Sequence, residues 1–238
     1  MAAVDLDVVG IVYSTACLRR GSTPIIDIFR FTWQVGVFYG IYQAYVAWVL
    51  PRIKGLSRGI GCPMLNSNNV NSDASVAWMK ALEPDFLMSF HFNQKMLESV
   101  IEIPRRAALN FHPSYLPAWR GVDPVLFALQ KSGATLGGSI HRVTAVIDAG
   151  DVLLREKLGC EHVAGLIKTN EALFMLGGRM AAEVIADFEM FDAQRVQQAQ
   201  LESDLDLDAG RYDGWFAAGQ LGMTRLWKAL WAKPRKVS

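Results

Sequence analysis

The stretch Asn110-Phe-His-Pro-Ser-Tyr-Leu-Pro-Ala-Trp-Arg-Gly121 decides the fold of this chain, because it carries a strand into a rigid polar loop. Asn110 and His112 are two residues apart, so in a continuing strand their side chains leave the same face. Pro113 and Pro117 restrict the backbone and remove two donors, which favours a shaped loop over a helix. Open α/β sheets bind ligands at the carboxyl ends of their strands. An amide and an imidazole at that point predict stabilisation of negative charge on a carbonyl oxygen.

The length and the strand pattern indicate one large α/β domain. At 238 residues the chain is long enough for such a domain with a modest appendage. We predict a catalytic domain over residues 1–190, with an apolar helical insert at 25–50. Residues 191–238 are predicted as a C-terminal extension.

Charge and cysteine usage exclude several classes of protein. The formal net charge is +1, and Lys and Arg are scattered until a short basic tail at 228–236. No basic stripe suits a phosphate backbone, so no nucleic-acid partner is expected. Neither a disulfide framework nor a secretory signal is recognisable, which predicts a cytoplasmic protein. The widely spaced cysteines are Cys17, Cys62 and Cys160.

Short β-branched or apolar runs closed by polar turns predict strands, and apolar residues at helical spacing predict helices. The predicted strands are Leu6–Ser14, Ile60–Leu65, Asp85–Phe90, Ala107–Phe111, Thr135–Val143 and Val152–Lys157. The predicted helices are Ser72–Leu82, Met96–Ile101, Pro124–Lys131 and Ala164–Phe188. The polar, acidic segment Gln194–Ala209 is predicted to be a solvated connection.

The apolar segment 25–50 admits three interpretations. Residues 31–50 contain no charged side chain and are long enough to cross a bilayer. A single span would separate the strand at 6–14 from Asn110 and His112, so the sheet would not assemble. Packing in the fold or in a homo-oligomer is therefore favoured over attachment at a membrane surface, and both are favoured over spanning.

Several catalytic classes lack their motifs. The chain contains no GxSxG elbow, no GxxxxGK[ST] loop and no GxGxxG fingerprint. No two of the four histidines form an HxxxH or HxH pair, and only Cys160 lies near a histidine in sequence, His162, so no metal site is predicted. The histidines are His91, His112, His141 and His162. His141, within a predicted strand, is expected to be a core residue or to support the site.

The remaining chemistry is non-covalent acyl-type transfer. Asn110 would donate to an oxyanion, and His112 would stabilise it or move a proton. An acid would orient the imidazole. Asp148 is preferred for this role and Asp151 is the nearby alternative, although Asp148 is also explained by a turn that closes before Gly150.

The pattern Asn110-x-His-Pro-Ser-x-Leu-Pro-x-x-Arg-Gly121, followed by Ile140-His141 and then Ile147-Asp-Ala-Gly-Asp151, resembles the 10-formyltetrahydrofolate-dependent formyltransferases. The resemblance extends from about residue 60 to residue 158 and preserves the spacing of about 35 residues between His112 and Asp148. It implies a Rossmann-like, open, mostly parallel sheet with flanking helices. It also implies that Asn110, His112 and Asp148 form the catalytic trio.

The resemblance also implies binding sites for two substrates, with 10-formyltetrahydrofolate as the formyl donor and no metal. Pterin contacts are implied for Gln94, Lys95, Met96, Ile101, Thr144 and Asp148. Acceptor contacts are implied for Ser114 and Arg120, of which Arg120 either meets an anionic group or only braces its loop.

Two departures from the family pattern accompany this resemblance. The strand and helix that usually precede a strand like Leu6–Ser14 are missing, so the sheet is expected to lack its usual first strand. The insert at 25–50 is the second departure, and a homo-oligomer or membrane-surface contact is assigned to it.

The predicted function is formyl transfer to a primary amine of a small molecule, with a nucleotide-linked amino sugar as the favoured acceptor. The chain shows no large basic C-terminal domain, which disfavours initiator tRNA. The alternatives are a formyltetrahydrofolate deformylase and a non-catalytic, membrane-associated or oligomeric protein.

Overall fold

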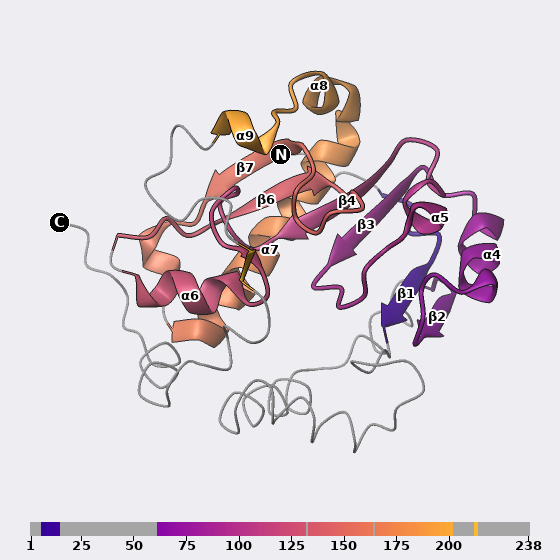
Figure 1. Ribbon diagram of the computed structural model, residues 1–238, viewed down its shortest axis with the longest axis horizontal. Helices are drawn as coiled ribbons and strands as arrows, with labels where there is room; N and C mark the ends of the chain where they lie inside the picture. The colour runs from indigo at the N-terminus through magenta and orange to yellow at the C-terminus, as the bar shows by residue number, and fades with distance from the viewer. Residues whose placement is uncertain (1–5, 15–60, 132, 164, 202–211, 214–238) are drawn as a thin grey trace, which may run out of the picture. The chain divides into compact units, whose positions relative to one another are not determined.

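The computed structural model describes residues 6–14, 61–131, 133–163, 165–201 and 212–213 (Figure 1). They fall into two compact units, one formed by residues 1–87 and 92–108 and the other by 88–91 and 109–238. The predicted insert at 25–50 and most of the predicted extension lie outside the described residues. The domain bounds and the absence of a first strand stay predictions.

The first unit contains a parallel strand pair and helix α4. Strand β1 (Ile11–Ser14) pairs with β2 (Met64–Ser67), and Ile11 lies opposite Met64. Helix α4 (Asp73–Ala81) begins after Ser72, whose hydroxyl accepts a hydrogen bond from the Ser75 backbone N–H at 3.3 Å. The predicted helix is confirmed, and Ser72 is its N-cap. The predicted first strand is shorter, because residues 6–9 are exposed and outside the ladder.

Strand β3 (Phe86–Phe90) begins in this unit, and its residues from Met88 onward belong to the second unit. The short helix α5 (Glu98–Ile101) buries Val100. Arg105 donates from Nε to the Asp85 carboxylate at 2.9 Å, and its backbone N–H donates to Pro84. These bonds hold the chain as it enters β4.

The second unit is built on a sheet with strand order β3-β4-β6-β7. The β4–β6 and β6–β7 pairs are antiparallel, and a separate parallel pair joins β5 to β8. The strands are β4 (Ala107–His112), β5 (Arg120–Gly121), β6 (Gly137–Arg142), β7 (Val152–Lys157) and β8 (Tyr212–Asp213). The predicted α/β class is confirmed, although β6 runs antiparallel to both of its neighbours, β4 and β7.

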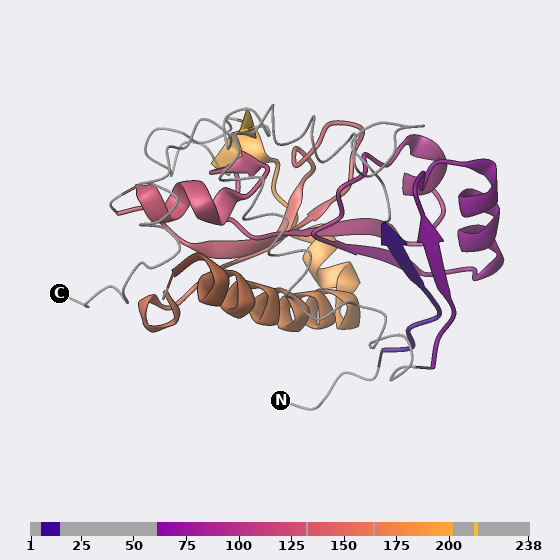
Figure 2. The same ribbon diagram turned by 90° about the horizontal axis from the view of Figure 1, so that it is seen from below.

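Helix α7 covers one face of this sheet (Figure 2). The single helix predicted over 164–188 ends at Ala186, and α8 begins after Asp187. No helix within the described residues is both long enough and apolar enough to cross a bilayer. The helical segments of the unit are α6 (Pro124–Gln130), the 3-10 turn η1 (Cys160–His162), α7 (Gly165–Ala186), α8 (Phe188–Ala193) and α9 (Gln198–Leu201).

Phe111 anchors β4 between two glycines. It is 1% exposed, and its ring contacts the rings of Phe90 and Phe174. A Cβ on Gly138 of β6 or on Gly177 of α7 would collide with the Phe111 ring. The absence of a side chain at Gly138 therefore lets β6 approach the Phe111 ring closely. Because side chains alternate along a strand, the residues on either side of Phe111 face away from α7.

Candidate active site

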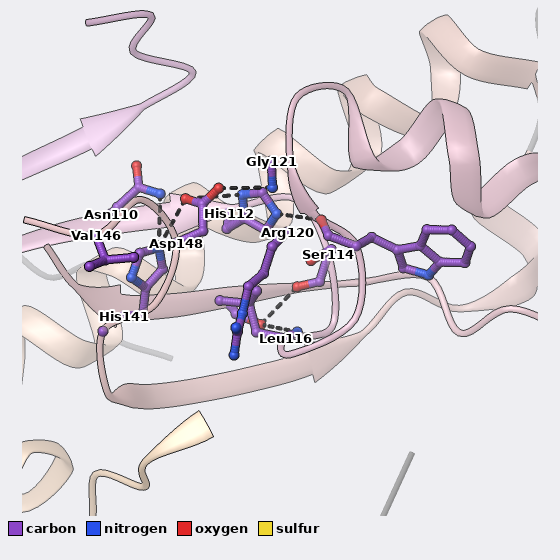
Figure 3. Close-up of polar contacts among 12 residues, drawn as sticks. Asn110, His112, Ser114, Leu116, Arg120, Gly121, His141, Val146 and Asp148 are labelled. Carbon is purple, nitrogen blue, oxygen red and sulfur yellow. Dashed lines mark hydrogen bonds and ion pairs between the residues drawn. The ribbon is translucent and has the colours of Figure 1, made fainter. Parts of the chain in front are cut away.

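The β4–β6 ladder brings two pairs of polar residues together on the face opposite α7. Asn110 lies opposite His141 (Figure 3), and in the same ladder His112 lies opposite Ser139. Residues opposite each other in an antiparallel pair share a face, so these four side chains converge. The register of β6 and β7 shifts between Ile140 and His141, and such irregularities re-aim side chains beside sites.

The hydrogen bonds of His141 fix the orientation of the Asn110 amide. His141 Nδ1 lies 2.8 Å from the Arg142 carbonyl oxygen, which only accepts, so Nδ1 carries a proton. Nε2 lies 3.0 Å from Asn110 Nδ2. In the neutral ring Nε2 therefore accepts from the amide. One Asn110 N–H is used by His141, and the second is left to donate to a ligand oxygen.

Burial keeps the His141 ring neutral. Its side chain is 3% exposed. Burial lowers the pKa of His141 to about 4, and the nearby Asp148 carboxylate offsets only part of that shift. Near neutral pH, His141 thus acts as an acceptor for Asn110 and not as a cation. The expectation that His141 is a core residue or supports the site agrees with this geometry.

Asp148 reaches the same cluster from the loop between β6 and β7. Its backbone adopts a left-handed conformation with φ of 53°, and Gly150 passes so close to the Arg142 carbonyl that a Cβ there would collide. The carboxylate accepts a hydrogen bond from the Gly121 N–H at Oδ2, at 3.0 Å. Its Oδ1 lies 3.6 Å from His112 Nδ1. Asp148 thus lies in the turn before Gly150 and also faces His112.

His112 has a partner at each ring nitrogen. Nε2 donates to the Trp119 carbonyl oxygen at 2.9 Å, while Nδ1 faces Asp148. The side chain is 5% exposed. The ring is therefore held in one orientation between the loop after β4 and the loop after β6. The structure brings the three predicted catalytic residues together, and their roles stay predictions.

Internal hydrogen bonds shape the loop between β4 and β5. Ser139 donates to the Ser114 carbonyl at 2.7 Å and accepts from the Leu116 N–H at 3.0 Å. The Ser114 hydroxyl donates to the Ala118 carbonyl at 2.7 Å and is buried. The Leu116–Pro117 peptide bond is cis. The hydroxyl of Ser114, which was predicted to contact the acceptor, is therefore hydrogen-bonded within its own loop.

Arg120 is held by a residue that the sequence did not point to. Its Nε donates to Gln198 Oε1 at 2.7 Å. Gln198 is 3% exposed, so the prediction of a solvated connection over 194–209 is wrong at this position. Neighbouring Gln197 and Gln200 are exposed. Nothing in a run of similar glutamines distinguishes the buried one, because only contacts with distant loops give it partners.

The predicted pterin contacts divide between the two units. Gln94 and Lys95 lie in the first unit together with Met96 and Ile101, whereas Thr144 and Asp148 lie in the second. The Gln94 amide accepts from the Val70 N–H at 2.8 Å and donates to the Ser67 carbonyl at 3.0 Å. It therefore braces its own unit.

The other side chains predicted to contact the pterin differ in burial and in hydrogen bonding. Met96 is buried and Lys95 is exposed. The Thr144 hydroxyl donates to the Val146 carbonyl. The pterin assignments stay predictions. In the part of the chain that the structure describes, no group of three His, Cys, Asp or Glu side chains is arranged to hold a metal ion.

Comparison with known proteins agrees with the fold and with the arrangement of the site. The chain spans about half the length of the curated relatives it matches. One of them, a methionyl-tRNA formyltransferase from Finegoldia magna, is 25% identical over 153 residues, which are 64% of this chain and 49% of the relative.

Two solved structures share the fold. A sugar N-formyltransferase from a Shewanella species has a TM-score of 0.54 at 18% identity, with 93% of this chain and 85% of that chain covered. A formyltransferase from Anoxybacillus kamchatkensis, solved with a formamido UDP-sugar and tetrahydrofolate, has a TM-score of 0.51 at 19% identity, with 74% and 94% covered. The family model described as formyl transferase matches residues 50–170, just over half of the sequence. This chain therefore belongs to the formyl transferase family, as its motifs predicted.

Proposed function

We propose that this protein transfers the formyl group of 10-formyltetrahydrofolate to a primary amine of a small molecule. The observation that carries the proposal is the clustering of three chemically distinct groups on one sheet face. Asn110 presents an oriented N–H donor, His112 presents a ring fixed at both nitrogens, and Asp148 faces that ring. Acyl transfer to an amine needs an oxyanion donor and a group that moves a proton.

The reaction follows from these positions. The amine attacks the formyl carbon, and Asn110 Nδ2 donates to the oxygen as it becomes an oxyanion. His112 Nδ1 accepts the proton that the attacking nitrogen loses, and the Asp148 carboxylate stabilises the imidazolium. The proton then passes to the folate nitrogen as its bond to the formyl carbon breaks. The products are the formamide and tetrahydrofolate.

The donor and the oriented amide fit each other chemically. A formyl oxygen is a hydrogen-bond acceptor, and the second Asn110 N–H is a donor that His141 cannot use. We therefore assign donor-carbonyl binding to Asn110, and the pterin contacts stay predictions.

We favour a nucleotide-linked amino sugar as the acceptor. Two considerations support this choice. A solved structure of the same fold is described with a formamido UDP-sugar, and Arg120 lies one residue before Gly121, which binds Asp148. A guanidinium there suits an anionic substrate group.

The decisive experiment is incubation of the purified protein with the folate donor and a panel of amines, with products identified by mass spectrometry. A formylated product is expected, together with its loss in Asn110→Ala and His112→Ala. Asn170→Ala is the matched control, because its amide bonds within α7 to the Leu166 carbonyl. Formate release without any amine would instead identify a deformylase. No formyl product and no formate would overturn the proposal.

We also propose a cytoplasmic location, which rests on the three widely spaced cysteines. Self-association or membrane-surface attachment is assigned to residues 25–50. Sedimentation with liposomes and analytical ultracentrifugation separate these two alternatives. A monomer that does not bind liposomes would remove both.

A further inference from the structure

A buried glutamine joins the two loops that hold the catalytic acid. Gln198, in α9, donates from Nε2 to the Asp148 carbonyl at 2.9 Å and to the Gly150 carbonyl at 2.8 Å. Its Oε1 accepts from Arg120 Nε at 2.7 Å. Both amide hydrogens and the amide oxygen are thus in use. The side chain is 3% exposed, so no water competes for these partners.

These bonds close a ring of interactions around Asp148. The Asp148 carboxylate binds the Gly121 N–H, and Gly121 follows Arg120 in the chain. Arg120 binds Gln198, which returns to the backbone of Asp148. The acid is therefore held at its side chain by one loop and at its carbonyl by Gln198.

The backbone of Asp148 needs such support. A non-glycine residue at φ of 53° is strained and persists only when its surroundings determine it. The hydrogen bonds to the Asp148 and Gly150 carbonyls act on that loop. Without them the loop would relax, and Oδ1 would leave its place opposite His112 Nδ1.

We infer that Gln198 is a positioning residue for the catalytic acid, which acts by donating to the Asp148 and Gly150 carbonyls. This inference rests on the proposed function for its kinetic consequence only. It does not make Gln198 a catalytic residue, because the side chain touches loop backbone and Arg120. A shift of about 1 Å at a reacting group costs on the order of 100-fold in rate.

The kinetic test compares Gln198→Met, Gln198→Glu and Gln197→Met. Met removes every polar contact at similar volume, whereas Glu keeps an acceptor for Arg120 but places oxygen against two carbonyl oxygens. Both are expected to lower kcat by about 10-fold to 100-fold while the KM of the amine changes little. Gln197 is exposed, so Gln197→Met should match the parent. A Glu variant with parental kcat would overturn the inference, since bonding to Arg120 would then suffice.

A second measurement does not depend on activity. The ring ¹⁵N chemical shifts of His112 report the partners of Nδ1 and Nε2. They should change in Gln198→Met and Gln198→Glu and stay at parental values in Gln197→Met. If the parent forms no formyl product but these shifts respond, the proposed function fails and the positioning role stands. If His112 is unchanged in both Gln198 variants, the positioning role fails.

The parent protein gives a test that holds even if both variants unfold. A Gln198 side-chain amide with both hydrogens bonded should exchange with solvent far more slowly than that of exposed Gln197. NMR resolves the two side-chain signals. Equal exchange rates would overturn the inference.

Discussion

The Asp148 carboxylate accepts a hydrogen bond from the Gly121 backbone N–H at 3.0 Å, which ties the loop after β6 to strand β5. The two residues are 27 positions apart in the chain. The other carboxylate oxygen faces His112 Nδ1 at 3.6 Å. One side chain thus combines a structural bond with a charge beside the imidazole, and these two contributions can be separated by mutation.

Asp148→Asn should separate them. The asparagine oxygen still accepts from Gly121, but the charge that stabilises the His112 imidazolium is lost. We expect kcat to fall by about 10²-fold to 10⁴-fold, with the thermal midpoint changed little. Asp151→Asn is the matched control, because that acid lies 3.4 Å from exposed Arg195. Equal losses in the two variants would contradict the assignment of Asp148.

Asn110→Asp should remove the oxyanion donor at nearly constant volume. A carboxylate cannot donate to a developing oxyanion, and it would face the acceptor Nε2 of His141. We expect kcat to fall by at least about 10²-fold, measured by formyl product formation at saturating donor. Asn170→Asp is the control on α7. Retained activity in Asn110→Asp would show that the oxyanion is stabilised elsewhere.

The stability of the protein should fall in mild acid because of His141. Its pKa is lowered from 6.5 to about 4, chiefly by burial, so between these values the unfolded chain binds more protons than the folded one. The free energy of unfolding therefore rises with pH from about 4 to about 6.5, and the contribution is lost as pH falls through that window. The slope reaches up to about 1.4 kcal/mol per pH unit.

Urea unfolding at several pH values measures this slope. His141→Gln should flatten it. Ile140→Val on the same strand should lower the free energy of unfolding by about 1 kcal/mol at every pH and keep the slope. A slope that survives in His141→Gln would assign the acid sensitivity to another group.

Two adjacent glycines of α7 should respond in opposite directions to alanine. A Cβ on Gly177 would lie 2.7 Å from the Phe111 ring, whereas a Cβ on Gly178 meets no atom within 4 Å. Gly177→Ala should destabilise the protein by about 1–3 kcal/mol. Gly178→Ala should stabilise it by about 0.5–1 kcal/mol, because alanine favours the helix. Equal effects would contradict the packing of Phe111 against α7.

The sequence by itself determined the family and the α/β class, and it predicted the trio Asn110, His112 and Asp148, which the structure brings together. The family was recognised by the resemblance of its motifs. Local chemistry is sufficient for the shared face of Asn110 and His112, because period-two spacing puts them on one side of the strand, and the prolines shape the loop that follows. Helix α4 was likewise predictable, since its apolar residues recur at helical spacing within one short segment.

Only the tertiary structure decided how the site is held together. The neutral His141 that orients Asn110 depends on burial between strands, and the buried Gln198 depends on loops about 50 residues earlier. Gln198 looks like its exposed neighbours in the sequence. Its role arises because the chain returns to β7, where Val196 pairs with Val152, and carries the next residues toward Asp148. Contacts at such separation leave no local pattern, because their partners are set by the path of the whole chain.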